Sequence, residues 1–178
     1  MARRILSFKL PEFVGVTLII SLIVGVTFVN LKASYRRSRD LQRKNDVRSL
    51  FEIAYEYKGK YGSFPASQDG KIVACNPFTN EQGVLEFKAC EWYQSEALGK
   101  RVLGDPQQGQ GGGYFYVSTG DHFQAFGALE SIREDEYDEA VFARNLTCNE
   151  RICNFGRSSE KTPLDVSLEE FEQSLPTQ

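Results

Sequence analysis

An uncharged apolar block near the N-terminus constrains the fold more than any other feature of the chain. From Phe13 to Leu31 there are nineteen consecutive residues without a charged side chain. As a helix rising 1.5 Å per residue, the block spans about 28 Å, which matches the hydrocarbon thickness of a bilayer. The block is rich in β-branched residues, but strands of this length are very rare. We therefore expect a single membrane-spanning helix here.

A cleaved secretory signal peptide is the alternative interpretation of this block. The apolar region of a signal peptide has about 7–15 residues and ends in a small-x-small cleavage site. Here the block is longer, and it runs into Lys32, Arg36, Arg37 and Arg39. The pattern favours an anchor that remains part of the protein.

Charge is distributed unevenly along the 178 residues. Residues 1–44 carry nine Lys or Arg and two acidic residues, a net charge of +7. Residues 45–178 carry twelve basic and twenty-two acidic residues, a net charge of −10. An acidic domain lacks the cationic surface that releases counterions from phosphate, so we predict no nucleic-acid partner.

The basic residues that flank the block bear on the orientation of the span. Three precede the block and six follow it: Arg3, Arg4 and Lys9, then Lys32, Arg36, Arg37, Arg39, Arg43 and Lys44. Counted in this way, the positive-inside rule would leave the large domain in the cytoplasm.

The cysteines indicate the opposite orientation. Cys75, Cys90, Cys148 and Cys153 form an even set without a C-x-x-C metal pair. Of the possible connectivities, short loops favour Cys75–Cys90 and Cys148–Cys153. Four buried free thiols in a reduced domain are the alternative, so neither feature alone decides the topology.

Helical periodicity continues beyond the membrane block. Apolar residues recur at helical spacing at Val47, Leu50, Phe51, Ala54, Tyr57 and Tyr61. Since no proline interrupts residues 12–64, one continuous helix of about fifty residues is predicted, ending before Pro65. We expect Leu50, Phe51, Ala54 and Tyr57 to form a buried stripe beneath a β-hairpin.

The remaining chain predicts a small head. Residues 66–113 are expected to form loops with short elements, and residues 114–129 a hairpin with Phe123, Ala125, Gly127 and Leu129 on one side. Residues 158–178 are predicted to be an acidic, flexible tail, in which residues 164–175 could form a short helix. The predicted class is α+β, with a long N-terminal helix packed by its second half on a small antiparallel sheet.

No catalytic constellation is recognisable, and the prediction is a protein that is not an enzyme and holds no cofactor or metal. His122 is the only histidine, and we expect it to face solvent on a strand. The glycine run at residues 109–113 lacks the Lys-Ser/Thr of a phosphate-binding loop. Asp105, Asp121 and the acidic residues 134–139 are expected to be solvated surface groups.

The residues before the apolar block follow a recognisable order. Arg3 and Arg4 are followed by Ser7, Phe8 and Glu12. This order resembles the prepilin processing segment of type IV pilins and type II secretion pseudopilins. That family has a basic leader, a small residue before the cut, a new N-terminal Phe and a Glu at the fifth mature position.

Later segments fit the same resemblance. Residues 39–47 resemble the family's basic helical segment, residues 57–65 its helix exit, and residues 105–106 and 114–130 its short sheet. Two positions depart from the pattern: Ser7 replaces the usual Gly, and Lys9 places a charge at the second mature position. The calcium-site loop of the major pseudopilins is not recognisable.

The resemblance implies a division of the chain and a set of partners. Residues 1–7 would be a leader, 8–31 the transmembrane and filament-core half of the helix, 32–157 the rest of the helix with a pilin-like head, and 158–178 the tail. A prepilin peptidase would cut between Ser7 and Phe8, and the new N-terminus would be methylated. Glu12 would then pair with the Phe8 α-amine of a neighbouring subunit.

The function implied is that of a non-enzymatic, single-pass membrane subunit with an extracytoplasmic head. It would assemble with other pilin-like subunits into a type IV pilus or type II secretion-like filament, or regulate one. The alternative is a permanently anchored extracytoplasmic binding module that does not polymerise.

Overall fold

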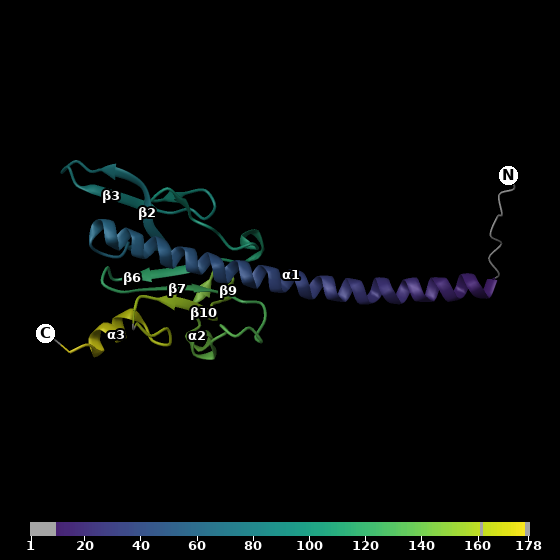
Figure 1. The fold of residues 1–178 in the computed structure, drawn as a ribbon. Coiled ribbons are helices and arrows are strands. Elements are labelled where there is room, and N and C mark those ends of the chain that lie inside the picture. Colours follow the sequence, from purple (N-terminus) through teal and green to yellow (C-terminus); the bar gives the residue numbers. More distant parts are fainter. Residues whose placement is uncertain (1–9, 161, 177–178) are drawn as a thin grey trace, which may run out of the picture. The chain divides into compact units, whose positions relative to one another are not determined.

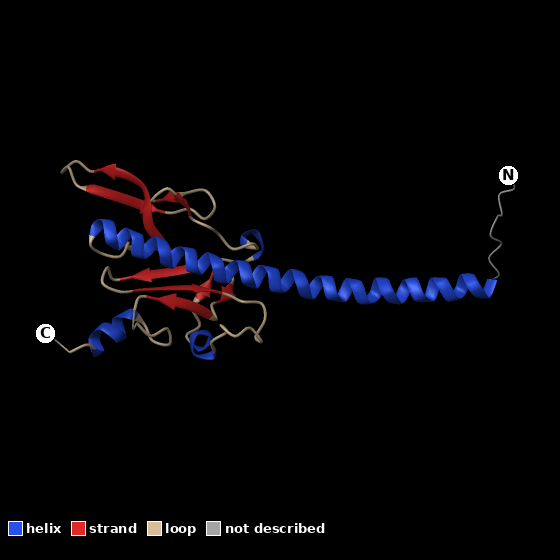
Figure 2. Ribbon diagram, viewed as in Figure 1, coloured by secondary structure: helices blue, strands red, loops and turns tan. Residues whose placement is uncertain are grey.

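The computed structural model describes residues 10–160 and 162–176, with side chains from residue 11 onward. These residues form one long helix, two antiparallel sheets, a short two-stranded hairpin and two short helices (Figures 1 and 2). The α+β class expected from the sequence is confirmed. The chain divides into two units whose boundary lies within the long helix, between Ser38 and Arg39; the second unit is the head.

Helix α1 runs without interruption from Leu10 to Tyr61, over 52 residues. This confirms the continuous helix that the absence of proline predicts. The helix ends at Gly62, whose φ of 90° is favourable only for glycine and whose amide donates to the Lys58 carbonyl at 2.8 Å. Lys58 and Lys60 lie in the last turn, where cations interact favourably with the terminal carbonyl groups.

The first sheet follows the helix directly. It contains β1 (Ser67–Gln68), β2 (Lys71–Thr79), β3 (Leu85–Ala89), β4 (Glu96–Ala97) and β5 (Lys100–Arg101). Strand β2 pairs with β1, β3 and β4, and all of these pairs are antiparallel. Four of the strands are short, as expected for residues 66–113, but the nine-residue β2 was not predicted. Register shifts in its pairing with β3 and its internal Pro77 remove the regular alternation of apolar and polar residues that indicates a strand in a sequence.

The second sheet has the order β10-β7-β6. Strands β6 (Phe115–Ser118) and β7 (Phe123–Gly127) form the predicted hairpin, with Tyr116 opposite Ala125, and β10 (Phe155–Ser158) pairs with the other edge of β7. Every residue of β7 is buried. The strand is covered on both faces, and a polar residue at an alternate position, Gln124, is therefore buried too.

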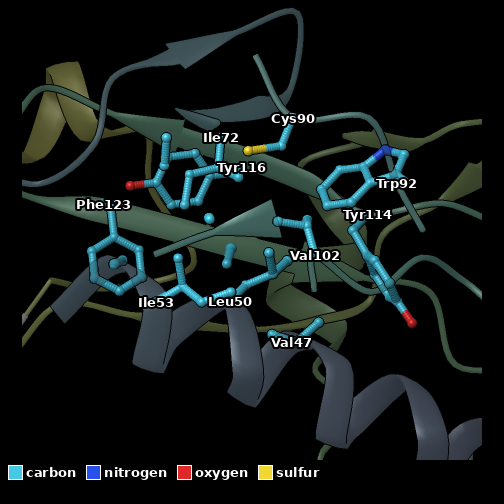
Figure 3. Close-up of a cluster of buried hydrophobic side chains, with 14 of the residues drawn as sticks. Val47, Leu50, Ile53, Ile72, Cys90, Trp92, Val102, Tyr114, Tyr116 and Phe123 are labelled. Carbon is cyan, nitrogen blue, oxygen red and sulfur yellow. The ribbon is translucent and has the colours of Figure 1, made fainter. Parts of the chain in front are cut away.

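One face of β7 contributes to a core that includes α1 and both sheets (Figure 3). Its members from α1 are Val47, Leu50, Ile53 and Ala54, and those from the rest of the head include Ile72, Cys90, Trp92, Val102, Tyr114, Tyr116, Phe123 and Ala125. These side chains fill the space between the helix and the strands, as Figure 3 shows.

The predicted stripe on α1 is partly correct. Leu50 and Ala54 are buried as expected, whereas Phe51 and Tyr57 are only half-buried. The Phe51 ring lies 5.7 Å from that of Phe123 in the hairpin. Tyr57 instead contacts Phe87 of β3, at 5.2 Å between ring centroids. The stripe therefore faces two sheets, because the first sheet occupies part of the helix surface assigned to the hairpin.

The other face of β7 packs on a second, smaller core. Its buried residues are Phe126, Ala128, Val141, Cys148 and Cys153. They come from β7 and the residues after it, from α2 (Glu139–Ala143), and from the hairpin of β8 (Thr147–Cys148) and β9 (Arg151–Ile152). The second unit is therefore layered, with the second sheet between α1 and these smaller elements.

The C-terminal segment packs on the head where a flexible tail was expected. Ser159, Thr162 and Leu168 are buried, and the Gln124 amide donates to the Val166 carbonyl at 2.9 Å. Helix α3 (Leu168–Ser174) starts with a capping box formed by Ser167 and Glu170. A composition rich in acidic residues does not reveal these few buried contacts.

His122 also differs from its expected solvent-facing position. It is half-buried, with its Nδ1 3.2 Å from Glu172 Oε1 and its ring 5.1 Å from that of Phe171. Both partners belong to α3. The contact follows from the packing of the C-terminal segment, which the sequence did not indicate.

The helix–sheet core can be tested by a pair of leucine truncations on α1. Leu50→Ala should lower the free energy of unfolding by about 2–5 kcal/mol, because it leaves a cavity in a packed core. Leu41→Ala, on the same helix with its side chain 57% exposed, should change it by less than about 0.5 kcal/mol. Urea denaturation of the full chain in detergent measures both. Equal effects of the two substitutions would contradict the packing described.

Candidate functional site: an apolar helix segment and a buried ionic cluster

The apolar segment of α1, residues 13–31, exposes its side chains. Phe13, Leu22 and Val29 are 65%, 70% and 68% exposed. Soluble monomers rarely expose so large a contiguous apolar surface. The backbone polar groups are paired within the helix, and the Thr17 hydroxyl donates to the Phe13 carbonyl at 2.8 Å. The segment is thus long and apolar enough to cross a membrane.

Glu12 lies in the first turn of α1, directly before the apolar segment, and is exposed. A carboxylate at this position interacts favourably with the amide groups at the start of a helix. Ser7 and Phe8, the two residues of the predicted cleavage site, lie outside the described residues. The cleavage and the pairing of Glu12 with a neighbouring α-amine therefore stay predictions.

Arg43 lies at the centre of a buried ionic cluster in the head. Its guanidinium donates from Nε to Asp105 Oδ2 at 2.7 Å. Its Nη1 lies 2.8 Å from both Asp40 Oδ1 and Glu130 Oε1. We call Asp40, Arg43, Asp105 and Glu130 the Arg43 cluster. The side chains of Asp40, Arg43 and Asp105 are completely removed from solvent.

The Arg43 cluster joins three separate parts of the chain. Asp40 and Arg43 are one turn apart on α1, Asp105 follows β5, and Glu130 follows β7. The Asp40 carboxylate also accepts the backbone amides of Glu130 and Ser131, at 2.9 and 3.1 Å. Each partner is thus fixed by more than one hydrogen bond, as a buried charge requires.

Glu130 is shared by two arginines. Arg39 donates to both of its oxygens at 2.6 Å, in the bidentate geometry that arginine favours. The hydrogen bond from Arg39 and that from Arg43 lower the pKa of Glu130 to about 2. Burial alone would lower the pKa of Arg43, but its hydrogen bonds to Asp105 and Glu130 raise it above its ordinary value. Arg43 and Glu130 are therefore both charged at neutral pH.

The glycine run at residues 109–113 has a structural role beside this cluster. A Cβ atom added to Gly112 would clash with Asp105 Oδ1. Only glycine allows the backbone to approach the Asp105 carboxylate so closely. This contact also corrects the expectation for Asp105, which is 1% exposed and not a solvated surface acid.

A further buried carboxylate lies near the cluster. Asp46 is 3% exposed and accepts a hydrogen bond from the Tyr114 hydroxyl at 2.7 Å. Burial raises the pKa of Asp46 from 3.8 to about 6. The Tyr114 hydrogen bond opposes this shift, and the negative charge of Asp105 adds to it. At neutral pH the ionised Asp46 therefore costs folding free energy.

Both predicted disulfides are present. Cys75 and Cys90 connect β2 to the residue after β3, and Cys148 and Cys153 close the loop that contains β8 and β9. No cysteine is free, so the alternative of four buried thiols is wrong. Within residues 10–160 and 162–176, no three His, Cys, Asp or Glu side chains are arranged to hold a metal ion.

The sequence signalled the Arg43 cluster only weakly. Asp40 and Arg43 have the i, i+3 spacing of a helical ion pair, and this was the one local sign of a contact. Asp105 and Glu130 are 62 and 87 residues from Arg43, so only the fold brings them together.

Comparison with known proteins finds no matching family model, no similar curated protein and no similar solved structure.

Asp46→Asn tests the cost of the buried carboxylate. Because the folded pKa is raised, the stability linked to protonated Asp46 is present below about pH 4 and is lost as the pH rises to about 6. Asparagine is always neutral and can still accept from Tyr114. The free energy of unfolding of the variant should exceed that of wild type by about 1–3 kcal/mol at neutral pH. This difference should shrink toward pH 4.

Urea denaturation at several pH values measures this difference, and other titrating groups cancel in the comparison. Asp121→Asn, at an exposed position in the hairpin turn, is the matched control. Its free energy of unfolding should stay close to that of wild type at every pH tested. A destabilised Asp46→Asn variant at neutral pH would show that the carboxylate is needed in its charged form.

Proposed function

We propose that this protein is a non-enzymatic pilin-like subunit that is anchored in the membrane by the first part of α1. It would assemble into, or regulate, a type IV pilus or type II secretion-like filament. The observation that carries the proposal is the continuity of α1. One unbroken helix contains an exposed, uncharged segment of membrane-spanning length and, further along, the residues that form the core of an α+β head.

The exposed apolar segment is suited to two successive environments, a bilayer and a filament. In a bilayer, residues 13–31 would face lipid, and the helix would satisfy its own backbone groups. In a filament, the same side chains would face the equivalent segments of neighbouring subunits. Either environment removes from water the apolar surface that the isolated chain exposes.

The prepilin-type order of residues supports the filament over a simple anchor. Cleavage after Ser7 would create an α-amine on Phe8, four residues before Glu12. A carboxylate at the edge of a membrane helix is costly unless it is neutralised. Pairing between Glu12 of one subunit and the Phe8 amine of the next would neutralise both charges and set the axial stagger between subunits.

The two disulfides support an extracytoplasmic head, because disulfides persist in oxidising compartments and are rare in the cytoplasm. A simple count of the basic residues after the span favours the opposite orientation, with the head in the cytoplasm. However, Arg39, Arg43 and Lys44 are each bound to carboxylates of the head. Their presence therefore has a structural explanation that is independent of topology.

Glu12→Gln tests the proposed assembly. The substitution keeps the size of the side chain and lies outside the head, so insertion and folding should be unchanged. Loss of one member of a buried pair costs roughly 3–5 kcal/mol, enough to lower the subunit–filament equilibrium by about a hundredfold or more. The measurement is the yield of surface filaments or of secretion, normalised to the amount of inserted protein.

Glu52→Gln is the matched control, since Glu52 is an exposed glutamate on the same helix that forms a surface ion pair with Arg48. It should assemble like wild type. Filament yield or secretion at wild-type level with Glu12→Gln would contradict the pairing.

A further inference from the structure

Six basic residues follow the apolar segment, between positions 32 and 44, and the structure divides them into two sets of three. Arg39, Arg43 and Lys44 belong to the head. Arg39 and Arg43 bind Glu130 at 2.6 and 2.8 Å, and Lys44 Nζ lies 2.8 Å from Glu134 Oε2. These three cations are occupied by carboxylates of their own chain.

The other set, Lys32, Arg36 and Arg37, is exposed. In the part of the chain that the structure describes, none of the three has an acidic partner. The Lys32 ammonium lies 4.9 Å from the centroid of the Phe28 ring, at the end of the apolar segment. Tyr35, between them in sequence, is 60% exposed. These residues are therefore available to a partner outside the chain.

The helix places these side chains at a defined depth. Residues 32–37 lie within about 9 Å of Leu31 along a helix that rises 1.5 Å per residue. The headgroup layer of a bilayer is about 5–8 Å thick on each side of the hydrocarbon. Lys32 and Arg36 are one turn apart on one face, and Arg37 is about 100° further around the helix. The three cations would thus cover about 140° of the helix circumference at the level of the lipid phosphates.

We propose that Lys32, Tyr35, Arg36 and Arg37 form a collar that binds the phosphate groups of anionic lipids at the membrane surface. This inference rests on the membrane insertion of residues 13–31 that the proposed function requires. The arginines present planar forks that match phosphate oxygens. The Lys32 stem lies along apolar surface while its ammonium reaches the headgroups, and a tyrosine ring is well suited to the same layer.

The collar explains why a basic flank is compatible with an extracytoplasmic head. Half of the flank stabilises the head and the other half holds the helix at the lipid surface. An acidic patch on a neighbouring copy could also attract these cations. A lipid surface is favoured because the collar begins at the residue directly after the apolar segment, where headgroups must lie when that segment is inserted.

The test uses the full chain in phosphatidylcholine vesicles that contain a trace of spin-labelled lipid. Electron paramagnetic resonance separates lipid held at the protein from bulk lipid, so that labelled phosphatidylglycerol and phosphatidylcholine can be compared. The collar variant carries Lys32→Gln, Arg36→Gln and Arg37→Gln. Its preference for phosphatidylglycerol should be about fivefold lower than that of wild type at low salt. High salt should reduce the wild-type preference toward that of the variant.

A matched variant removes three exposed cations of the head: Lys88→Gln, Arg101→Gln and Arg133→Gln. It has the same change in charge and the same residue types, and it should keep the wild-type preference. An unchanged preference in the collar variant would overturn the proposal. In the collar variant, an unchanged lipid preference together with a reduced filament yield would overturn the proposal. It would indicate instead that these cations bind an acidic patch on a neighbouring copy.

The outcome is separate from that of the proposed function. Lipid selectivity is measured on inserted subunits and does not depend on filament formation. A loss of selectivity in the collar variant would support the collar even if Glu12→Gln left assembly intact. A wild-type protein without any preference for phosphatidylglycerol would overturn the collar and leave the proposed span and assembly unaffected.

Discussion

The guanidinium of Arg43 is completely removed from solvent, and it has to be neutralised by carboxylates from three separate stretches of chain. An isolated buried charge is costly, whereas a buried pair that is well hydrogen-bonded need add little net stability over apolar residues. The value of the cluster is therefore geometric. It fixes the loop after β5 and the residues after β7 against one turn of α1, because any other arrangement would leave a charge unpaired. The core from Val47 to Ala54 starts directly after this turn.

Much of the fold could be predicted because it depends on local patterns. The continuous helix follows from nineteen uncharged residues, helical periodicity and the absence of proline, and its end follows from Gly62. The hairpin at residues 115–127 follows from two β-rich runs around a short turn. The disulfide pairs follow from loop length. In each case the residues that determine the structure are close together in sequence.

The features that could not be predicted depend on distant residues. Acidic side chains such as Asp105 and Asp46 look like surface groups until Arg43 and Tyr114 are placed beside them. The burial of both faces of β7 depends on α1 and on the elements around Cys148, and Gln124 has no local sign of burial. At the predicted functional positions, the cleavage and the pairing proposed for Ser7, Phe8 and Glu12 would involve a peptidase and a neighbouring subunit, which a single chain does not contain.

The proposed function requires that α1 belongs to a processed subunit that can assemble, and not to a permanent anchor. Intact-mass spectrometry of protein extracted from the membranes of its host tests this most directly. We expect a mature chain that lacks residues 1–7 and begins at Phe8, with or without a methyl group on the new α-amine. A chain that still begins at Met1 would contradict the proposed function and would favour an anchored binding module that does not polymerise.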